Sequence, residues 1–261
     1  MPTDGVHVSP SGQKAFIPLE NNPSVFTSLI HDLGISAELC FHDVYSLDDP
    51  DLLSLVPRPA LALIFITPAP PYHTVRAIDG TPSVEDGLDS LTYDKCGDEE
   101  PVMWFRQTIN NACGLMALLH AVANGEAREF VREGSTLGRL LQQAAPLKPR
   151  PRADMLHASE ELERAHMRAA RLGDTTAPRA EDPCEHHFLA FVKGRDGHLW
   201  ELEGSSDGPI DRGEMRERED MLSEASLERG VRRFMRAADG NLGFSVVALA
   251  RRPGGDVSPL P

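Results

Sequence analysis

The chain has 261 residues, of which 41% are hydrophobic and 25% are charged, a length and composition typical of a folded protein with a sizeable core. Its 26 basic and 40 acidic side chains give a formal net charge of −14. This argues against nucleic acid as the main partner, because phosphate binding needs a basic face. The longest strongly apolar run, ALALIFI at residues 60–66, is too short to span a bilayer, so we expect no membrane segment.

Helices and short strands are indicated in the first hundred residues. Residues 1–15 are polar and contain proline and glycine, so we expect a flexible N-terminus. Hydrophobic spacing then predicts a helix over 23–33, a strand over 39–45, a helical turn over 48–59 and a buried strand over 60–66. The first helix has Asn22 as its candidate cap and Gly34 after its end. Residues 70–101 are polar and acidic without clean periodicity, which is typical of a long surface loop.

The second half opens with a helix that is apolar nearly all round. It begins at Cys113 and ends at Gly125, and such a helix belongs in the centre of a core. The elements that follow are helices over 135–145 and 158–172, a linker over 173–184, hairpin strands over 186–194 and 198–204, a basic amphipathic helix over 221–237 and a strand over 242–251. Strands in hairpins with one buried helix favour an α+β domain over a doubly wound parallel fold.

The distribution of charges and cysteines indicates what kind of partner and which cellular compartment to expect. Residues 1–105 carry 16 acidic and 4 basic side chains, so 4 − 16 = −12 of the net charge lies there. This excess is either a solvated face or a docking surface for a basic partner. The four cysteines form no CxxC pair, and the N-terminus lacks a secretory pattern. We therefore expect a cytoplasmic protein with reduced thiols and leave the nucleus open as a second compartment.

Cys113 is the candidate nucleophile. It lies at the start of the apolar helix, where backbone N–H groups and the helix dipole favour a thiolate. Gly114 removes a side chain beside the sulfur, which lets a substrate backbone approach. The alternative is a buried structural cysteine, which is the more common role of a cysteine about which nothing else is known.

A thiolate nucleophile needs a base, normally histidine, which a carboxylate or amide orients. His187 opens a predicted strand, and Glu203 lies 203 − 187 = 16 residues later on the paired strand. The Asp196-Gly197 turn between them can fold one side chain beside the other. His120, inside the apolar helix, is better explained as a core histidine, and His198 as a solvated one.

Gln107 is the candidate oxyanion donor. It lies 113 − 107 = 6 residues before the cysteine, close enough for its amide N–H to point where an oxyanion would form. A lone glutamine is more often a surface residue, and spacing alone does not decide between the two. A metal site using Cys184 with His186 or His187 is a third reading, but the short ligand spacings that structural zinc needs are missing. We expect no metal and no cofactor.

Three blocks surround these candidates, which are QTINNACGLMALLHAVAN, HFLAFV from His187 and GHLWELEG ending at Gly204. They resemble the active-site blocks of the ubiquitin C-terminal hydrolases, which are papain-like cysteine peptidases. The likeness continues through FIPLENNPSVFTSLIHDLGI, DVYSLDDPDLLSLVPRPALALIFITP, GSTLGRLL and LGFSVVALA, and so runs from about Phe16 to about Arg251.

The resemblance implies a role for each candidate. Cys113 would be the nucleophile, His187 the general base and then acid, and Gln107 the oxyanion donor. The orienting acid of the family is usually an aspartate in a Leu-Asp-Gly block, which here reads Leu-Glu-Gly with Glu203. Because glutamate is one methylene longer, either the hairpin register shifts or the contact with the histidine is looser. Asp207 is a weaker alternative for this role.

The resemblance also implies an architecture and a partner. We expect one catalytic domain over residues 16–251 with a flexible tail over 252–261, built as an antiparallel sheet between two helical lobes with a knotted backbone. A crossover loop within about residues 172–185 would pass over the active site and restrict what can leave. Ubiquitin would bind partly through the segment whose residues are Pro18, Leu19, Glu20, Asn21, Asn22 and Pro23. That segment also reads as a plain lead-in to the first helix.

Two functions follow from these expectations. The first is a monomeric thiol protease that cleaves after the C-terminal glycine of ubiquitin and releases small adducts or short peptides. Ubiquitin-like modifiers stay open as further substrates. The alternative is a ubiquitin-binding protein with weak or no catalysis, because Glu203 replaces the usual aspartate.

Overall fold

A single antiparallel sheet runs through the molecule. The computed structural model describes residues 3–81, 91–182 and 186–253. Its main sheet has six strands, which in spatial order are β3 (Leu39–Asp43), β8 (Ser245–Arg251), β4 (Ala62–Pro68), β5 (His186–Lys193), β6 (His198–Leu202) and β7 (Ile210–Glu214). Every neighbouring pair is antiparallel. A separate two-stranded sheet, β1 (His7–Val8) with β2 (Lys14–Ala15), lies near the N-terminus.

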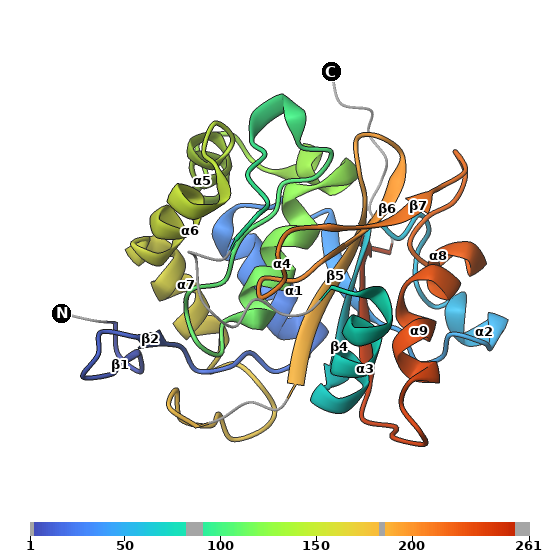
Figure 1. The fold of residues 1–261 in the computed structure, drawn as a ribbon, viewed down its shortest axis with the longest axis horizontal. Coiled ribbons are helices and arrows are strands. Elements are labelled where there is room, and N and C mark those ends of the chain that lie inside the picture. Colours follow the sequence, from blue (N-terminus) through green and yellow to red (C-terminus); the bar gives the residue numbers. More distant parts are fainter. Residues whose placement is uncertain (1–2, 82–90, 183–185, 254–261) are drawn as a thin grey trace.

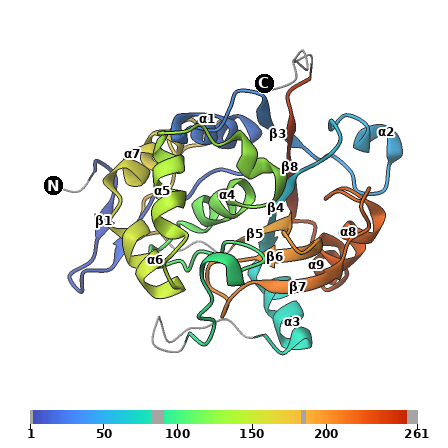
Figure 2. The same ribbon diagram turned by 90° about the horizontal axis from the view of Figure 1, so that it is seen from above.

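Helices cover both faces of the main sheet (Figures 1 and 2). One layer holds α1 (Pro23–Leu33), α4 (Cys113–Ala123), α5 (Thr136–Ala144), α6 (Pro149–His157) and α7 (Glu160–Ala169). The other holds α2 (Pro50–Leu53), α3 (Ala69–Asp79), α8 (Glu224–Arg229) and α9 (Val231–Arg236). Two 3₁₀ turns lie on either side of α4 in the sequence. They are η2 (Gly97–Glu99), before α4, and η3 (Gly125–Phe130), directly after it. The predicted α+β class, with an antiparallel sheet between two helical layers, is confirmed, and the knotted backbone stays a prediction.

Alternation along the strands divides the interior into two cores. In β4, Ala62 and Ile64 join the core shared with α1 and α4, whereas Leu63 and Phe65 join the core shared with α3 and α9. This is the period of two that side chains follow in any strand. His187 has the same parity as Leu189 in β5, and Leu189 belongs to the α3 core. The sheet therefore turns His187 toward α3.

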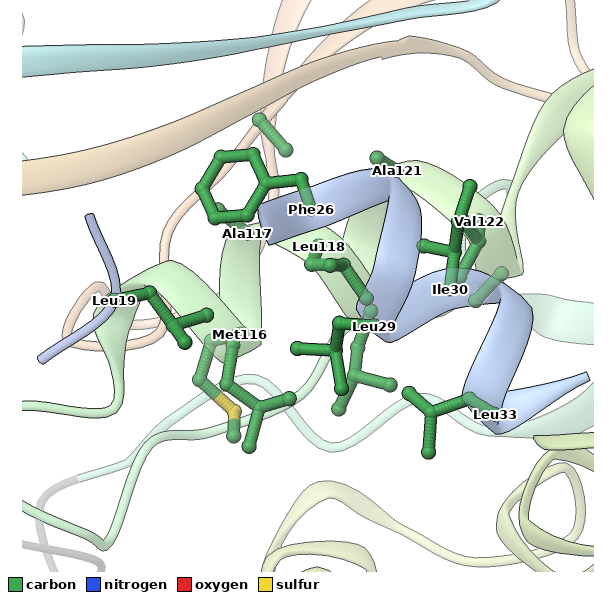
Figure 3. Packing of buried hydrophobic residues seen from close by; sticks show 14 of the residues in the cluster. Leu19, Phe26, Leu29, Ile30, Leu33, Met116, Ala117, Leu118, Ala121 and Val122 are labelled. Atoms are coloured by element: carbon green, nitrogen blue, oxygen red, sulfur yellow. The ribbon is translucent and has the colours of Figure 1, made fainter. Parts of the chain in front are cut away.

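The local signals for α1 and α4 are confirmed. The Asn22 side chain caps α1 by accepting a hydrogen bond from the Ser24 N–H at 2.8 Å, and Gly34 ends the helix with φ of 113°. Every residue of α4 after Cys113 is buried, as its all-round apolar pattern predicts. The apolar side chains of α1 and α4 pack against each other in the larger core (Figure 3).

Four parts of the chain depart from the sequence expectations. The stretch that was expected to be a loop contains α3, whose Pro70 and Pro71 stand at the helix start, where proline is tolerated. The helix expected over 221–237 is divided into α8 and α9 at Gly230, where a Cβ atom would lie 3.0 Å from the Ser226 carbonyl oxygen. Strand β7 and helix α6 have polar, irregular sequences that carry no clear periodicity. Among the described residues, no helix combines the length and the apolar character needed to cross a membrane.

Candidate active site

Cys113 is the first residue of α4 and the only residue of that helix that is not fully buried. The residue before it, Ala112, has a methyl side chain and caps no N–H group of the first turn. The positive end of the helix dipole is therefore directed at the Cys113 sulfur, where it favours a negative charge. Cys113, Cys40 and Cys96 are outside any disulfide, and Cys184 lies outside the described residues.

The segment before α1 packs against the start of α4. A Cβ atom at Gly114 would lie 3.3 Å from the Leu19 Cβ atom, so the glycine lets the two backbones approach. Leu19 is buried and belongs to the same hydrophobic core as Met116 of α4 (Figure 3). Leu19 thus anchors the predicted ubiquitin-binding segment to the helix that carries the candidate nucleophile.

Gln107 lies between the end of β6 and the first turn of α4. Its backbone N–H donates to the Gly204 carbonyl oxygen at 2.9 Å, and its side-chain Nε2 donates to the Ile109 carbonyl oxygen at 3.0 Å. A Cβ atom at Gly204 would lie 2.7 Å from the Gln107 Cβ atom and 3.3 Å from the Met116 Cγ atom. Gly204 of the Leu-Glu-Gly block therefore holds the backbone of Gln107 in place through this hydrogen bond and close packing.

His187 lies at the start of β5, with its ring against α3. The ring stacks on Tyr72 with the centroids 3.8 Å apart and the planes 8° apart, and it meets His73 edge-on at 5.7 Å. Burial lowers the pKa of His187 below its ordinary value. The Glu203 carboxylate opposes this decrease by favouring the charged ring. The structure thus brings Glu203 within electrostatic reach of His187.

The Glu203 carboxylate is buried and accepts hydrogen bonds from three neighbouring residues. Its Oε2 atom accepts from the Tyr72 hydroxyl at 3.0 Å, the Ser205 hydroxyl at 2.6 Å and the Ser206 hydroxyl at 3.1 Å. Its Oε1 atom accepts from the Ser205 N–H at 2.9 Å. Within the described part of the chain, no hydrogen bond joins this carboxylate to the His187 ring. The sequence allows either a shifted hairpin register or a looser contact with the histidine, and the choice between the two stays a prediction.

Asp207 is committed to a different task. Its carboxylate accepts from the Thr92 N–H at 2.6 Å, from the Thr92 hydroxyl at 2.5 Å and from the Tyr93 N–H at 3.4 Å. These bonds hold the segment that follows the undescribed residues 82–90. Asp207 therefore anchors this segment, and Glu203 is the carboxylate that acts electrostatically on the His187 ring.

The predicted crossover loop is anchored at two places among its described residues. Near its start, the Glu20 carboxylate accepts from the Asp174 N–H at 3.2 Å and from the Thr175 N–H at 3.0 Å. The Asn22 side chain adds a bond of 3.0 Å to the Asp174 carboxylate. The hydrogen bonds from Thr175 and Asn22 lower the pKa of Glu20 to about 2, so this carboxylate is charged at neutral pH.

The second anchor of the loop comes from the segment just before Cys113. Asn111 has a φ of 58°, and its side-chain Nδ2 donates to the carbonyl oxygens of Ala180 and Asp182, each at 2.9 Å. The asparagine side chain tolerates this left-handed backbone better than most. Residues 183–185 of the predicted loop lie outside the described part of the chain.

Two other histidines have the surroundings expected from the sequence. His120 is fully buried, and its Nε2 accepts from the Phe105 N–H at 3.0 Å, as befits a core histidine. His198 is partly exposed and lies 2.9 Å from the Asp211 carboxylate, which raises the pKa of this histidine. Within the described ranges, no group of three or more His, Cys, Asp or Glu side chains could hold a metal ion.

The family of the chain follows from comparison with known proteins. The sequence pattern described as ubiquitin carboxyl-terminal hydrolase, family 1, matches residues 16–236. The chain belongs to the ubiquitin carboxyl-terminal hydrolase family. The resemblance seen in the sequence is thereby confirmed.

Relatives within this hydrolase family cover most of the chain. Ubiquitin carboxyl-terminal hydrolase 3 of Arabidopsis thaliana is 32% identical over 93% of this chain and 97% of its own length. A ubiquitin carboxyl-terminal hydrolase of Aplysia californica is 37% identical over 77% of this chain and 86% of its own length.

Solved structures of the hydrolase family share the fold. Trichinella spiralis UCH37 bound to ubiquitin vinyl methyl ester has a TM-score of 0.64 and 20% identity, over 90% of this chain and 82% of that one. Its catalytic domain in the same complex has a TM-score of 0.66 and 21% identity, over 90% of this chain and 95% of that one. At such identities the likeness shows the fold alone.

Three residues of the site were missed in the sequence. Ser205 follows Glu203 directly, so a local reading could have found it as a partner of the carboxylate. Asn111 lies two residues before Cys113, but its target is about 70 residues away. Tyr72 comes from the expected loop, 131 residues from Glu203, and no local signal marks it.

Proposed function

We propose that this hydrolase family member is a deubiquitinating cysteine peptidase. It hydrolyses the bond after the C-terminal glycine of ubiquitin and releases small adducts or short peptides. The observation that carries the proposal is Cys113 as the first residue of α4, with Gln107 held beside that helix and His187 within electrostatic reach of Glu203, in a chain of this family. The ubiquitin vinyl methyl ester complexes of Trichinella spiralis UCH37 support ubiquitin as the partner.

Catalysis begins with the Cys113 thiolate, whose proton has passed to His187. The sulfur attacks the carbonyl carbon of the terminal glycine, and the carbonyl oxygen becomes an oxyanion. The Cys113 backbone N–H and the Gln107 side-chain amide stabilise that oxyanion. His187 then gives its proton to the leaving amine, and the glycine remains as a thioester on the sulfur.

Water completes the cycle. His187 accepts a proton from the attacking water, the thioester bond breaks, and Cys113 leaves as the thiolate with the ubiquitin carboxylate released. Glu203 favours the protonated imidazole in both halves of the reaction. Because burial lowers the pKa of His187, the acid limb of the pH profile lies below the ordinary pKa of histidine.

Gln107 can serve as the oxyanion donor while keeping its present contact. A primary amide has two N–H groups, and the bond to the Ile109 carbonyl oxygen uses one of them. The second remains for the oxyanion. The contact between Gly204 and Gln107 holds the donor in place.

Ubiquitin reaches the site beside residues 1–105, which carry most of the net negative charge. The segment from Pro18 to Pro23 grips ubiquitin in this proposal and at the same time anchors the crossover loop through Glu20 and Asn22. The loop limits the size of the adduct that can leave, which favours small adducts and short peptides. The enzyme acts as a monomer in the cytoplasm, with no metal or organic cofactor.

Reaction with a ubiquitin probe that carries a C-terminal electrophile tests the proposal. We expect a covalent adduct that peptide mapping assigns to Cys113, and its loss in Cys113→Ala while ubiquitin binding is retained. Cys40→Ala is the matched control, because burial raises the pKa of the Cys40 thiol and makes it a poor nucleophile. Absence of an adduct in a folded wild-type protein would refute the proposal.

A ubiquitin-binding protein with little catalysis is the second candidate. The missing hydrogen bond between His187 and Glu203, among the described residues, is the observation in its favour. Turnover of a fluorogenic ubiquitin amide by the wild type and by Glu203→Asp separates the two functions. A wild type that binds ubiquitin without turnover, and a variant that gains turnover, would establish the binding role instead.

A further inference from the structure

Tyr72 contacts both His187 and Glu203. Its ring lies flat on the imidazole with the centroids 3.8 Å apart, and its hydroxyl donates to the Glu203 Oε2 atom at 3.0 Å. The two contacts use different parts of one rigid side chain. The positions of the ring that accepts the proton and of the carboxylate that supports it are therefore coupled through Tyr72.

The coupling matters because the acid here is glutamate. The additional methylene gives the carboxylate more rotational freedom than an aspartate has. The hydroxyls of Tyr72, Ser205 and Ser206 converge on Oε2 and remove that freedom. With no hydrogen bond from Glu203 to His187 among the described residues, Tyr72 is the side chain that spans the two.

Tyr72 itself is held rigidly from within α3. The residue is completely buried, and the Arg76 guanidinium lies 4.8 Å from the centroid of its ring. Arg76 is ion-paired with the buried Glu201 of β6, so the helix is tied to the hairpin that carries Glu203. Figure 1 shows α3 beside the ends of β4 and β5.

The same ion-pair network continues to the C-terminal end of α3, because Arg212 pairs with both Glu201 and Asp79. The Asp79 carboxylate lies 2.6 Å from a guanidinium nitrogen of Arg212 on β7 and also pairs with Arg233 of α9. Burial by itself would raise the pKa of the Glu201 carboxyl, but Arg76 and Arg212 outweigh burial and the pKa is lowered. These charged contacts leave α3 little freedom to move relative to the sheet.

We propose that Tyr72 is a positioning residue of the hydrolase site, whose ring fixes the plane of the His187 imidazole and whose hydroxyl holds the Glu203 carboxylate. The inference rests on the proposed hydrolase function. It adds a fourth side chain to the Cys-His-acid arrangement and assigns it to the helix that the sequence did not indicate. Tyr72 is completely buried, so its side chain is out of reach of ubiquitin and acts through His187 and Glu203.

The charged and titratable groups that face His187 fix the expected direction of change. Glu203 favours the charged imidazole, whereas His73, Arg76 and His186 disfavour it. In Tyr72→Phe the carboxylate loses one donor, so its negative charge is less compensated. The pKa of His187 should then rise, and the acid limb of kcat/KM should move to higher pH.

Kinetics of Tyr72→Phe and Tyr72→Leu with a fluorogenic ubiquitin amide test the proposal. Tyr72→Phe keeps the stacking and should lower kcat about tenfold with KM changed less than about twofold, because only the hydroxyl bond to a carboxylate is lost. Tyr72→Leu loses both contacts and should lower kcat further. Tyr93→Phe is the matched control, since this hydroxyl donates to the buried Glu100 at 3.3 Å, and kinetics should be unchanged.

The pH profile distinguishes positioning from mere packing. A packing role would lower thermal stability and the active fraction but leave the acid limb of kcat/KM where it is in the wild type. In a Glu203→Gln background, Tyr72→Phe should cause no further shift of that limb, because the hydroxyl acts through the carboxylate. An unmoved acid limb in folded Tyr72→Phe, or equal shifts in both backgrounds, would overturn the inference.

A titration of the His187 ring by NMR separates this inference from the proposed function. The ring signal can be assigned with His187→Gln, and its pKa should be higher in Tyr72→Phe than in the wild type even in a protein without turnover. An unchanged His187 titration would reject the Tyr72 role. A shifted titration without any probe adduct at Cys113 would retain that role and reject the hydrolase.

Discussion

At the scale of single residues, the site depends on side chains with more than one contact. Gln107 uses its backbone N–H for Gly204 and its side chain for Ile109, and both bonds are local to the entry of α4. Glu203 is held by its own neighbours Ser205 and Ser206. Each role can therefore be removed by a substitution that leaves the backbone contacts in place.

Gln107→Ala removes the side-chain donor and keeps the bond from its N–H to Gly204. We expect kcat for a ubiquitin amide to fall about 100-fold to 1000-fold with a small change in KM, because the oxyanion forms only in the transition state. Gln142→Ala, at an exposed position of α5, is the control. A kcat within about twofold of wild type in Gln107→Ala would exclude the oxyanion role.

At the scale of elements, the site joins segments that are far apart in sequence. The lead-in to α1 packs on α4 through Leu19 and holds the predicted crossover loop through Glu20. A Cβ atom at Gly173 would lie 2.6 Å from a Glu20 carboxylate oxygen, so a side chain at this position would force the Glu20 carboxylate to shift. A segment predicted to bind ubiquitin thus also holds the start of the loop that is predicted to limit the leaving adduct.

Glu20→Gln should release the start of this loop. The variant loses the charge that strengthens the bonds from Asp174 and Thr175, so hydrogen exchange at these two amides should quicken about tenfold. Because the pKa of Glu20 is about 2, the wild-type bonds should persist from neutral pH down to well below pH 4.

Glu38→Gln is the matched control for the loop experiment, since the exposed Glu38 pairs with Ser36 and Arg251 on another part of the surface. Its effect on exchange at Asp174 and Thr175 should be nil. Equal exchange at these amides in wild type and Glu20→Gln would mean that Glu20 does not anchor the loop.

At the scale of the whole molecule, two buried histidines link folding to pH. Burial lowers the pKa of His120 to about 3 and that of His166 to about 4. An unfolded histidine titrates near pH 6.5. Below that pH the unfolded chain binds protons that the folded chain does not, so the free energy of unfolding falls as the pH is lowered from about 6.5 toward 4.

His120→Gln should reduce this pH dependence. Each buried neutral histidine changes the free energy of unfolding by about 1.4 kcal/mol per pH unit in that window, so the loss between pH 7 and pH 5 should shrink by about 2 kcal/mol. Urea unfolding at the two pH values measures it. His198→Gln is a control of opposite sign, because Asp211 raises the pKa of His198 in the folded protein. An undiminished loss in His120→Gln would contradict the assignment.

The sequence by itself determined the parts whose signals are local. The cap at Asn22, the end of α1 at Gly34 and the all-round apolar α4 each follow from residues a few positions apart. The candidates Cys113, Gln107 and His187 came from short blocks in family order. Their catalytic roles stay predictions, while the family and the antiparallel α+β fold are established.

Only the tertiary structure decided how Glu203, His187 and the segment near Thr175 are held. Tyr72 and Glu203 are 131 residues apart, Glu20 and Thr175 are 155 apart, and Arg76 and Glu201 are 125 apart. Helix α3 uses the buried, charged Arg76 on the face that packs on the sheet, where its partner Glu201 lies on β6. Because a charged residue takes the place of an apolar one on this face, the sequence shows no apolar stripe that would indicate a helix. Contacts of this kind give no periodic pattern in the sequence, because the two partners become neighbours only after the sheet has formed.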